Sequence, residues 1–383
     1  MQIPDSKTQT CSLCVMDSSD PEISFDANGV CNHCIEFDTV TRHNWFPNAE
    51  GVERWAAIVE QIKAAGRGQE YDCILGLSGG VDSSYLAIKV NEWGLRPLVV
   101  HVDAGWNSEL AVANIEALVK HCNYDLHTHV VDWEEMRDLH LAYLHAGISN
   151  QDVPQDHIFF SSLYHFATKN KIRYVLSGGN LATEGVFPNA WHGSAMDAIN
   201  LKAIHRKYGK RKLQNYKTIS FFQYYIWYPF FKKMRTVRPL NYMPYDKAKA
   251  LEELEKTVGY KPYARKHGES QFTKVFQNYY LPEKFGYDKR RPHLSSLIVS
   301  GQMSRDEALV KLGEPLYAAD ELEIDIAYFC KKLQISREQF DVFMRNPIHH
   351  YTDFPTWGGR YRFMKKIQNF MARIMGKKIT VYS

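Results

Sequence analysis

Residues 78–84 constrain the fold of this chain more than any other segment. They read Ser-Gly-Gly-Val-Asp-Ser-Ser, directly after the apolar run 73–77 and directly before the helix-like stretch 85–90. Two glycines let backbone N–H groups approach an anion closely, and the dipole of the following helix adds positive potential at the same place. The segment therefore predicts a strand, a phosphate-binding turn and the start of a helix.

The side chains of this loop suit a polyphosphate that is bridged by a metal ion. Two serines add hydroxyl donors, and Asp82 offers a carboxylate to Mg²⁺. No lysine follows the glycines, so the Walker signature with its grip on a transferring γ-phosphate is absent. The expected ligand is an extended polyphosphate, and the residues expected to bind it here are Ser78, Gly79, Gly80, Asp82, Ser83 and Ser84.

The same string resembles the pyrophosphate loop (PP-loop) of the ATP pyrophosphatases, which include GMP synthetase, NAD synthetase, asparagine synthetase and the tRNA-thiolating enzymes. The resemblance implies cleavage of ATP to AMP and pyrophosphate. The alternative is an ordinary serine- and glycine-rich turn before a helix. Its position favours the nucleotide, because a second apolar strand at 97–102 ends in Asp103, which gives a βαβ unit with ligand groups at the carboxyl ends of its strands.

Strand-like and helix-like runs alternate through the first half of the chain. The strands are expected at 71–77, 97–102, 127–131 and 172–176, and the helices between and after them at 83–93, 108–121, 133–145 and 156–169. This alternation predicts a doubly wound α/β domain with a parallel sheet over 49–190, of the adenine nucleotide alpha hydrolase-like type that the PP-loop resemblance implies. From about 190 onward the strand signals vanish, so 191–383 is predicted to be a mainly helical substrate or partner region.

The fourth strand is followed by a second glycine turn, Ser177-Gly178-Gly179-Asn180, and then by Glu184. In a parallel sheet this turn lies on the same rim as the first loop, so Glu184 and Asp82 are expected to share one Mg²⁺. Gly178 and Asn180 are expected to contact the nucleotide. The string resembles the glycine–asparagine–Thr/Ser–Glu segment of NAD synthetase, where the glutamate is implied to be a metal ligand. A turn that only caps a helix is the alternative.

Four cysteines near the start of the chain have the spacing of a tetrahedral metal site. Cys11 and Cys14 form one C-x-x-C knuckle, and Cys31 and Cys34 form a second. A hairpin between the knuckles would bring four thiolates onto one Zn²⁺, which makes 1–48 a zinc-ribbon-like module with a structural role. Disulfides and an iron–sulfur cluster are the alternatives.

Composition excludes few functions. The net charge is only +4, which does not predict nucleic-acid binding by the whole chain, and the basic run 206–212 is interpreted as a solvated face. The N-terminus lacks a secretion signal, so a cytoplasmic protein is expected. The apolar run 219–231 is too short to span a membrane and is expected to be a core or interface helix, with shallow contact with a membrane surface as the alternative.

Beyond the loop, three further strings carry a resemblance that runs over nearly the whole chain. They are Lys266-His267-Gly268-Glu269-Ser270-Gln271-Phe272-Thr273, Leu281-Pro282-Glu283-Lys284-Phe285-Gly286-Tyr287-Asp288-Lys289-Arg290 and His293-Leu294-Ser295-Ser296-Leu297-Ile298. With the cysteine module before the loop, they resemble the N-acetyl sugar amidotransferase family of surface-polysaccharide and flagellin-sugar pathways. The resemblance implies that an N-acetyl group on a nucleotide-linked sugar is converted into an acetamidino group.

The charged residues of these strings are the candidates for the chemistry at the acceptor. Lys289 or Arg290 would offset negative charge on the adenylate or on a nucleotide-sugar phosphate, and His267 or Glu269 would relay the proton from ammonia. A structural ion-pair network is the alternative for each of them.

Ammonia has to be supplied from outside the chain. The chain carries neither an N-terminal nucleophilic cysteine nor a G-x-C-x-G elbow, so a separate glutaminase is expected. The resemblance suggests partner subunits similar to the glutaminase and cyclase-type halves of imidazole glycerol phosphate synthase.

Two other functions compete with this one. A tRNA-thiolating enzyme would need a reactive cysteine near the rim and a strongly basic RNA-binding face. A sensor or scaffold that binds ATP without turnover would not need both Asp82 and Glu184.

Overall fold

A parallel five-stranded sheet lies at the centre of the molecule. The computed structural model describes residues 9–263 and 268–375. The strands are β1 (Cys73–Gly76), β2 (Pro97–Asp103), β3 (Leu126–Val130), β4 (Tyr174–Leu176) and β5 (Arg235–Val237), and they pair in the order β3-β2-β1-β4-β5. All four pairings are parallel. The predicted doubly wound α/β fold is therefore confirmed.

Alternate residues of the strands point to opposite faces of this sheet, and helices cover both faces. Ile74 of β1 packs with one set of helices, and Leu75 packs with the other. The first set is α5 (Trp133–Ala146), α6 (Val153–Lys169), α8 (Ala198–Tyr208) and η3 (Gln223–Phe231). The second is α2 (Ala49–Ala65), α3 (Val81–Glu92), α4 (Glu109–Cys122) and α9 (Lys247–Val258).

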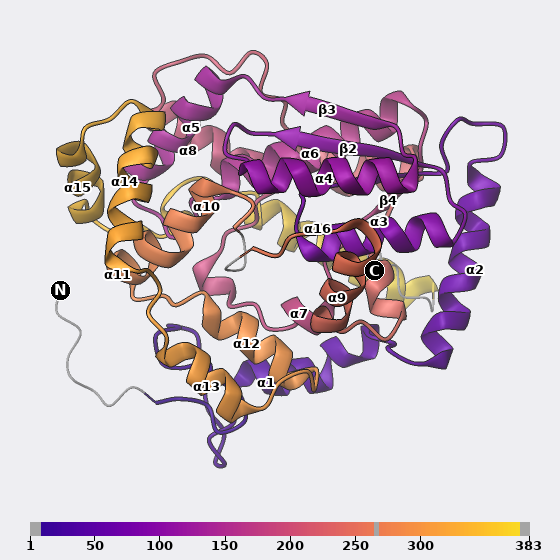
Figure 1. Cartoon of the computed structure of the whole chain (residues 1–383), viewed down its shortest axis with the longest axis horizontal. Coiled ribbons are helices and arrows are strands. Elements are labelled where there is room, and N and C mark those ends of the chain that lie inside the picture. Colours follow the sequence, from indigo (N-terminus) through magenta and orange to yellow (C-terminus); the bar gives the residue numbers. More distant parts are fainter. Residues whose placement is uncertain (1–8, 264–267, 376–383) are drawn as a thin grey trace.

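The remaining helices lie around the sheet, and α14 and α15 lie beyond the end to which the strand arrows point (Figure 1). These remaining helices are α1 (Asn32–Thr39), η1 (Thr41–Asn44), α7 (Leu181–Glu184), η2 (Asn189–Trp191), η4 (Pro239–Tyr242), α10 (Gln271–Val275), η5 (Phe276–Tyr280), α11 (Leu281–Phe285), α12 (Arg290–Val299), α13 (Arg305–Gly313), α14 (Ala319–Leu333), α15 (Arg337–Arg345), η6 (Tyr351–Asp353) and α16 (Gly358–Met375). Helices α10, η5, α14 and α15 share a third core, which reaches the α/β part through Trp106 and Leu144.

Two capping boxes that the sequence indicates are present. The Ser304 hydroxyl accepts a hydrogen bond from the backbone N–H of Glu307 at the start of α13, and the Glu307 carboxylate accepts one from the N–H of Ser304. Ser336 and Gln339 form the same reciprocal pair at the start of α15. Each box satisfies two backbone donors that a helix end leaves without partners.

The expectation that strands end near residue 190 is wrong at one place. Strand β5 pairs with β4 in the register Tyr174↔Arg235 to Leu176↔Val237. The predicted boundary at 190 therefore divides the sheet, because this strand comes from the part of the chain beyond it. The expected core helix at 219–231 also differs: in its wide-turned helical part, η3, only Tyr228 is buried.

Across the two ranges that the structure describes, no helix combines the length and the apolar character needed to cross a membrane.

Candidate active site

The predicted phosphate loop lies where the strand order of the sheet reverses. Strand β1 lies between β2 and β4, and the carboxyl ends of the strands at such a reversal of strand order are the usual position of a ligand site in an open α/β sheet. The loop 78–80 follows β1, and α3 begins at Val81 with Gly80 as its N-cap. The site is therefore at the place where α/β proteins of this kind bind ligands.

Hydroxyl groups hold the loop in its conformation. The Oγ atoms of Ser78 and Ser83 lie 3.0 Å apart, and Ser83 Oγ also donates to the carbonyl of Gly80 at 3.1 Å. Gly79 has φ +85°, a left-handed conformation that favours glycine. Ser84 is fully buried, and its hydroxyl has no hydrogen-bond partner among the described residues. Of the predicted serines, Ser78 and Ser83 thus keep some exposure to solvent, whereas Ser84 faces the interior.

The second glycine turn comes into direct contact with the first loop. A Cβ atom on Gly178 would lie 3.0 Å from the backbone nitrogen of Ser83 and 3.1 Å from the carbonyl carbon of Asp82. Only glycine fits such an approach without displacing backbone. Asn180 caps α7, because its side-chain oxygen accepts from the N–H of Thr183 at 3.0 Å. The predicted convergence of the two turns is confirmed by this contact.

Asp82 is held by a tyrosine from the second half of the chain. Tyr245 Oη donates a short hydrogen bond to Asp82 Oδ1. Burial raises the pKa of Tyr245 far above its usual range, and the charges of Asp82 and Glu184 raise it further. Because the charges of both carboxylates raise the pKa of the same phenol, Asp82 and Glu184 lie near each other. Their carboxylate oxygens suit Mg²⁺, so a shared ion stays a prediction.

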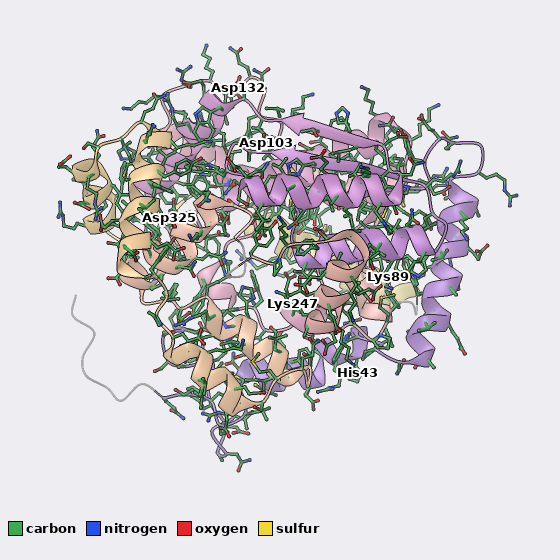
Figure 2. All side chains as sticks on the ribbon, viewed as in Figure 1. His43, Lys89, Asp103, Asp132, Lys247 and Asp325 are labelled. Atoms are coloured by element: carbon green, nitrogen blue, oxygen red, sulfur yellow. The ribbon has the colours of Figure 1, made fainter. Side chains whose placement is uncertain are left out.

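Two more tyrosines close the loop from the same side. Tyr260 Oη donates to the carbonyl of Gly79 at 2.8 Å, and Tyr263 Oη donates to the same carbonyl at 3.0 Å. On the other side, Asp103 lies at the end of β2 (Figure 2), where its Oδ1 accepts from the N–H of Gly105 at 2.8 Å. The carbonyl of Gly79 thus accepts two hydrogen bonds from protein, and binding of an anion by the N–H groups of the loop stays a prediction.

The charged residues of the C-terminal strings differ in where they lie relative to the loop. Glu269 lies at the loop: a Cβ on Gly80 would be 3.5 Å from Glu269 Oε1. Lys289 is buried, with Nζ in a short hydrogen bond to His192 Nε2 and 5.1 Å above the ring of Phe187. The predicted residues Lys266 and His267 lie outside the described residues.

The expectation that Arg290 contacts the adenylate is not supported by its contacts. Its Nε and Nη2 atoms bind the carboxylate of Asp288 at 2.7–3.1 Å. Its remaining donors go to the carbonyls of Lys311, Leu312 and Glu314 at the end of α13. All five N–H groups of the guanidinium are used inside the protein, so Arg290 has a structural role here.

Asp152 and Asp156 form a buried acidic cluster that the sequence analysis did not predict. Asp152 accepts hydrogen bonds from Thr273 Oγ1 at 3.0 Å and from Gln155 Nε2 at 3.2 Å. One turn later, burial, together with the charges of Asp152 and Glu184, raises the pKa of Asp156 to about 8, while the charge of Lys289 lowers it. The i,i+4 spacing of two aspartates was the available signal. This carboxyl lies within the electrostatic reach of both Glu184 and Lys289.

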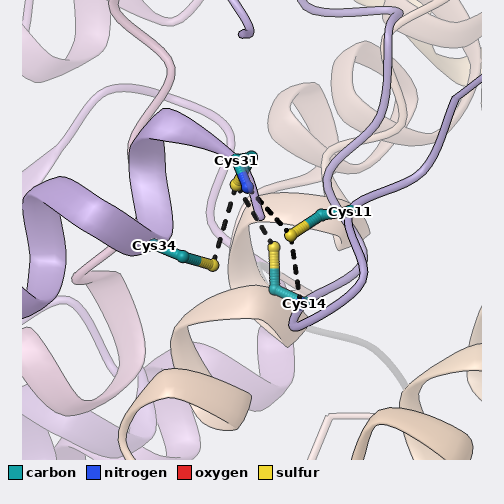
Figure 3. Close-up of side chains that lie close together, drawn as sticks. All are labelled: Cys11, Cys14, Cys31 and Cys34. Atoms are coloured by element: carbon teal, nitrogen blue, oxygen red, sulfur yellow. Dashed lines mark hydrogen bonds between the residues drawn. The ribbon is translucent and has the colours of Figure 1, made fainter. Parts of the chain in front are cut away.

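The four cysteines converge as expected (Figure 3). Their Sγ atoms all lie within 4.8 Å of one another and are buried, and the pairs Cys14–Cys31 and Cys31–Cys34 are 3.7 Å apart. A tetrahedral ion with Zn–S bonds of about 2.3 Å requires sulfur–sulfur separations of about 3.8 Å. The donor set therefore fits zinc.

This cysteine module supports the second glycine turn. It packs against Val186, Ala190 and Trp191, which follow Glu184 in the chain. Helix α12 holds the same segment: Ser296 Oγ accepts from the N–H of Val186 at 2.9 Å, and Ser300 Oγ donates to the carbonyl of Ala182 at 2.8 Å. The module and α12 together fix the position of the helix that carries Glu184.

The strand order and the two contacting glycine turns define a doubly wound parallel α/β fold with a glycine- and serine-rich loop after its first strand. Residues 269–368 match the family model described as "LPS biosynthesis protein WbpG-like, C-terminal domain". The part of the chain that contributes Glu269, Lys289 and α12 is thus similar to the C-terminal domain of WbpG-like lipopolysaccharide biosynthesis proteins.

Three solved structures are similar to the chain. NMN synthetase from Francisella tularensis is 14% identical with a TM-score of 0.35, over 71% of this chain and 100% of that one. NH3-dependent NAD synthetase from Campylobacter jejuni is 11% identical with a TM-score of 0.33, over 79% and 99%. NAD+ synthetase from Burkholderia pseudomallei is 18% identical with a TM-score of 0.28, over 60% and 95%. Comparison with curated proteins gives no match.

Proposed function

We propose that this chain is an ATP-dependent amidotransferase that converts the N-acetyl group of a nucleotide-linked sugar into an acetamidino group. The observation that carries the proposal is the position of the WbpG-like segment. It supplies Glu269 beside Gly80 and the α12 serines that hold the Glu184 helix. A segment similar to a domain of lipopolysaccharide biosynthesis proteins thus lies beside the predicted phosphate loop, which supports a glycan precursor as the acceptor.

The proposed reaction has two steps. The acetamido oxygen attacks the α-phosphorus of ATP, an O–P bond forms, and the bond from that phosphorus to pyrophosphate breaks. Ammonia then attacks the activated carbon, a C–N bond forms, and the C–O bond to AMP breaks with loss of one proton from nitrogen. The sugar oxygen leaves in AMP, so the sum is amide, ATP and ammonia to amidine, AMP and pyrophosphate. Adenylation is needed because an amide oxygen is a poor leaving group.

The described residues divide into two groups in this scheme. The N–H groups of the loop with Ser78 and Ser83 would bind the departing phosphates, and Asp82 and Glu184 would hold Mg²⁺, which offsets negative charge on pyrophosphate. Lys289 would offset charge on the adenylate. Glu269 and Asp156 would take the ammonia proton, together with the predicted His267.

The partners and the compartment belong to the same proposal. A separate glutaminase subunit and a cyclase-type subunit would supply ammonia, and the reaction would take place in the cytoplasm, where nucleotide sugars are made. Free ammonium salt at high concentration should replace both subunits in the test tube.

Labelled oxygen tests the proposal directly. The purified full chain is incubated with ATP, Mg²⁺, ammonium chloride and acetamido nucleotide sugars that carry ¹⁸O in the acetamido carbonyl. The expected products are an amidine sugar, lighter than its substrate by the difference between O and NH, and AMP that contains the label. The variant Asp82→Asn should form neither product.

Three outcomes would refute the proposal. They are ADP as the nucleotide product, an amidated carboxylate in place of an amidine, and AMP formation that depends on tRNA. Unlabelled AMP made from every substrate would show hydrolysis by water instead of transfer to a sugar.

A further inference from the structure

The positive charge of this chain is concentrated in two segments. Between residues 198 and 245 there are eleven lysines and arginines and no aspartate or glutamate, although the net charge of the whole chain is only +4. Residues 354–375 carry five more basic residues, again without an acidic one. The surplus of positive charge in these segments is therefore local, although Asp197, Asp246 and Asp353 flank the two segments and Arg211 pairs with Glu134.

The two segments meet in the structure. Trp357, just before α16, packs on the rings of Phe221 and Tyr225, with centroids 5.6 Å and 5.4 Å away. Tyr225 also contacts Tyr361 in the first turn of α16 at 5.4 Å. We call the surface formed by α8, η3 and α16 the basic aromatic face. Its parts are more than a hundred residues apart in sequence but adjacent in space.

Helix α16 exposes a row of large apolar side chains on this face. Phe363, Ile367 and Phe370 have the spacing i, i+4, i+7, which aligns them along one side of a helix. Their exposed fractions are 66%, 48% and 62%. The neighbouring Lys365 and Lys366 are exposed as well. A helix with such a row and with basic but no acidic side chains has the composition of helices that lie in a membrane interface.

Helix η3 repeats the same combination. Phe230 and Phe231 are 55% and 63% exposed, and Phe222 before the helix is 53% exposed. Lys232 and Lys233 follow directly and are also exposed. Adjacent aromatic and basic side chains suit the boundary between acyl chains and charged headgroups, because the rings enter the apolar layer and the ammonium groups stay at its surface.

A cavity of about 230 Å³ opens between α8, the residues just before η3 and the start of α16. Ile199, Phe221 and Pro355 contribute apolar walls, and Lys202, Arg206 and Arg360 contribute cationic side chains. Apolar walls with three cations match the chemistry of an anionic phospholipid, whose phosphate would meet the cations while its chains cover the apolar part. This cavity belongs to α8 and α16 and contains none of the phosphate-loop residues.

We propose that the basic aromatic face docks on the surface of an anionic membrane, with α16 lying in the interface. Charge selects this occupant. A second copy would present the same positive face and be repelled. A nucleic acid would be bound by the cations but would leave the apolar row of α16 in water. An anionic bilayer satisfies both features at once, and the proposal does not depend on the reaction catalysed at the loop.

Vesicle binding tests this proposal. The full chain is sedimented with phosphatidylcholine vesicles that contain either no phosphatidylglycerol or a large fraction of it. We expect binding to the anionic vesicles only, weakened by added salt. The variant Phe363→Ser/Ile367→Ser/Phe370→Ser should bind at least about tenfold more weakly, and Lys365→Glu/Lys366→Glu should lose about as much.

Matched controls distinguish vesicle binding by the basic aromatic face from non-specific binding by exposed apolar side chains elsewhere. Val310 and Ile324 are 71% and 69% exposed on α13 and α14, and Val310→Ser/Ile324→Ser should bind vesicles as well as wild type does. All variants change exposed side chains, so their melting temperatures should be unchanged.

Several outcomes would overturn the proposal. They are failure to bind anionic vesicles, equal binding to uncharged ones, and wild-type binding by the α16 variants. Self-association that the α16 serine variant abolishes would assign the face to a second copy, and salt-sensitive binding to RNA without vesicle binding would assign it to nucleic acid.

Discussion

Gly178 and Ser83 lie so close that a single methyl group does not fit between them. An added Cβ would be 3.0 Å from the Ser83 nitrogen, and this nitrogen is backbone that cannot move without shifting the start of α3. The turn after β4 and the loop after β1 are therefore one unit, even though they are about a hundred residues apart in the chain.

Gly178→Ala should displace one of the two turns. We expect at least about a tenfold loss in kcat/KM for ATP and a loss of about 1–3 kcal/mol in the free energy of unfolding, as for other overpacked sites. Exchange of labelled pyrophosphate into ATP and chemical denaturation measure the two effects. Gly313→Ala, where no atom lies within 4 Å of the new Cβ, should behave like wild type.

Tyr245→Phe removes the donor to Asp82 and keeps the ring. A hydrogen bond to a charged group contributes about 1.5–3 kcal/mol, so kcat/KM for ATP should fall about 10- to 100-fold. Tyr85→Phe is the control, because the Tyr85 ring packs on Tyr245 at 5.5 Å. A Tyr245→Phe enzyme as active as Tyr85→Phe would show that this contact does not serve the nucleotide site.

Lys289 and Arg290 should differ in what they affect. Lys289→Met is expected to lower kcat at least about a hundredfold, the scale of losing an electrostatic contact in a transition state, with a melting temperature near wild type. Arg290→Met breaks the Asp288 pair and the α13 contacts and should cost about 3–5 kcal/mol of stability. Kinetics at low temperature with thermal melting separate the two, and the reverse pattern would contradict these roles.

Cys31→Ser should remove the metal and loosen the Glu184 helix. We expect one zinc per chain by elemental analysis in the wild type and none in the variant, with a loss of several kcal/mol in stability, because metal binding is coupled to folding. Cys122→Ala, at the end of α4 and far from the module in sequence, should keep its zinc. Iron in the wild-type protein, together with absorbance in the visible range, would show that the four cysteines hold an iron–sulfur cluster and not zinc.

His140 should make the protein sensitive to acid. It is fully buried, accepts a hydrogen bond from Trp106 Nε1 at 3.1 Å, and burial lowers its pKa to about 3. A pKa that is lower in the folded state means stability present above the unfolded value of about 6.5 and lost as pH falls, by about 2–3 kcal/mol near pH 4.5.

The variant His140→Gln keeps an acceptor but cannot be protonated, so its stability should fall less between neutral pH and about pH 4.5. His121→Gln, at an exposed position of α4, is the control and should follow the wild-type curve. Equal acid sensitivity of the two variants would remove His140 as the cause. Denaturation at a series of pH values gives the comparison.

Local signals explain what the sequence could predict. Apolar runs that end in glycine turns are short-range patterns, so the loop, the turn at Gly178 and the four cysteines were all identifiable. Strand β5 was missed because Arg235-Thr236-Val237 is short and polar, and its strand conformation comes from pairing with β4. Charge density suggested a catalytic Arg290, but the carbonyls of α13 that satisfy it carry no sequence signal.

The tyrosines at the loop illustrate the same limit. Tyr245, Tyr260 and Tyr263 reach their partners across 163, 181 and 184 residues. A tyrosine whose hydroxyl donates to a distant carbonyl looks, in the sequence, like any other aromatic residue near a helix. Only the folded chain distinguishes these three from the twenty others.

These three tyrosines also impose an order on synthesis. When a ribosome has released only the α/β part of the chain, the carbonyl of Gly79 and the carboxylate of Asp82 have not yet met their donors. We therefore expect a nascent chain to bind nucleotide weakly until about residue 263 has left the ribosome and Tyr263 has packed against the loop. Fragments that stop before that point should be poor starting material for dissecting the enzyme.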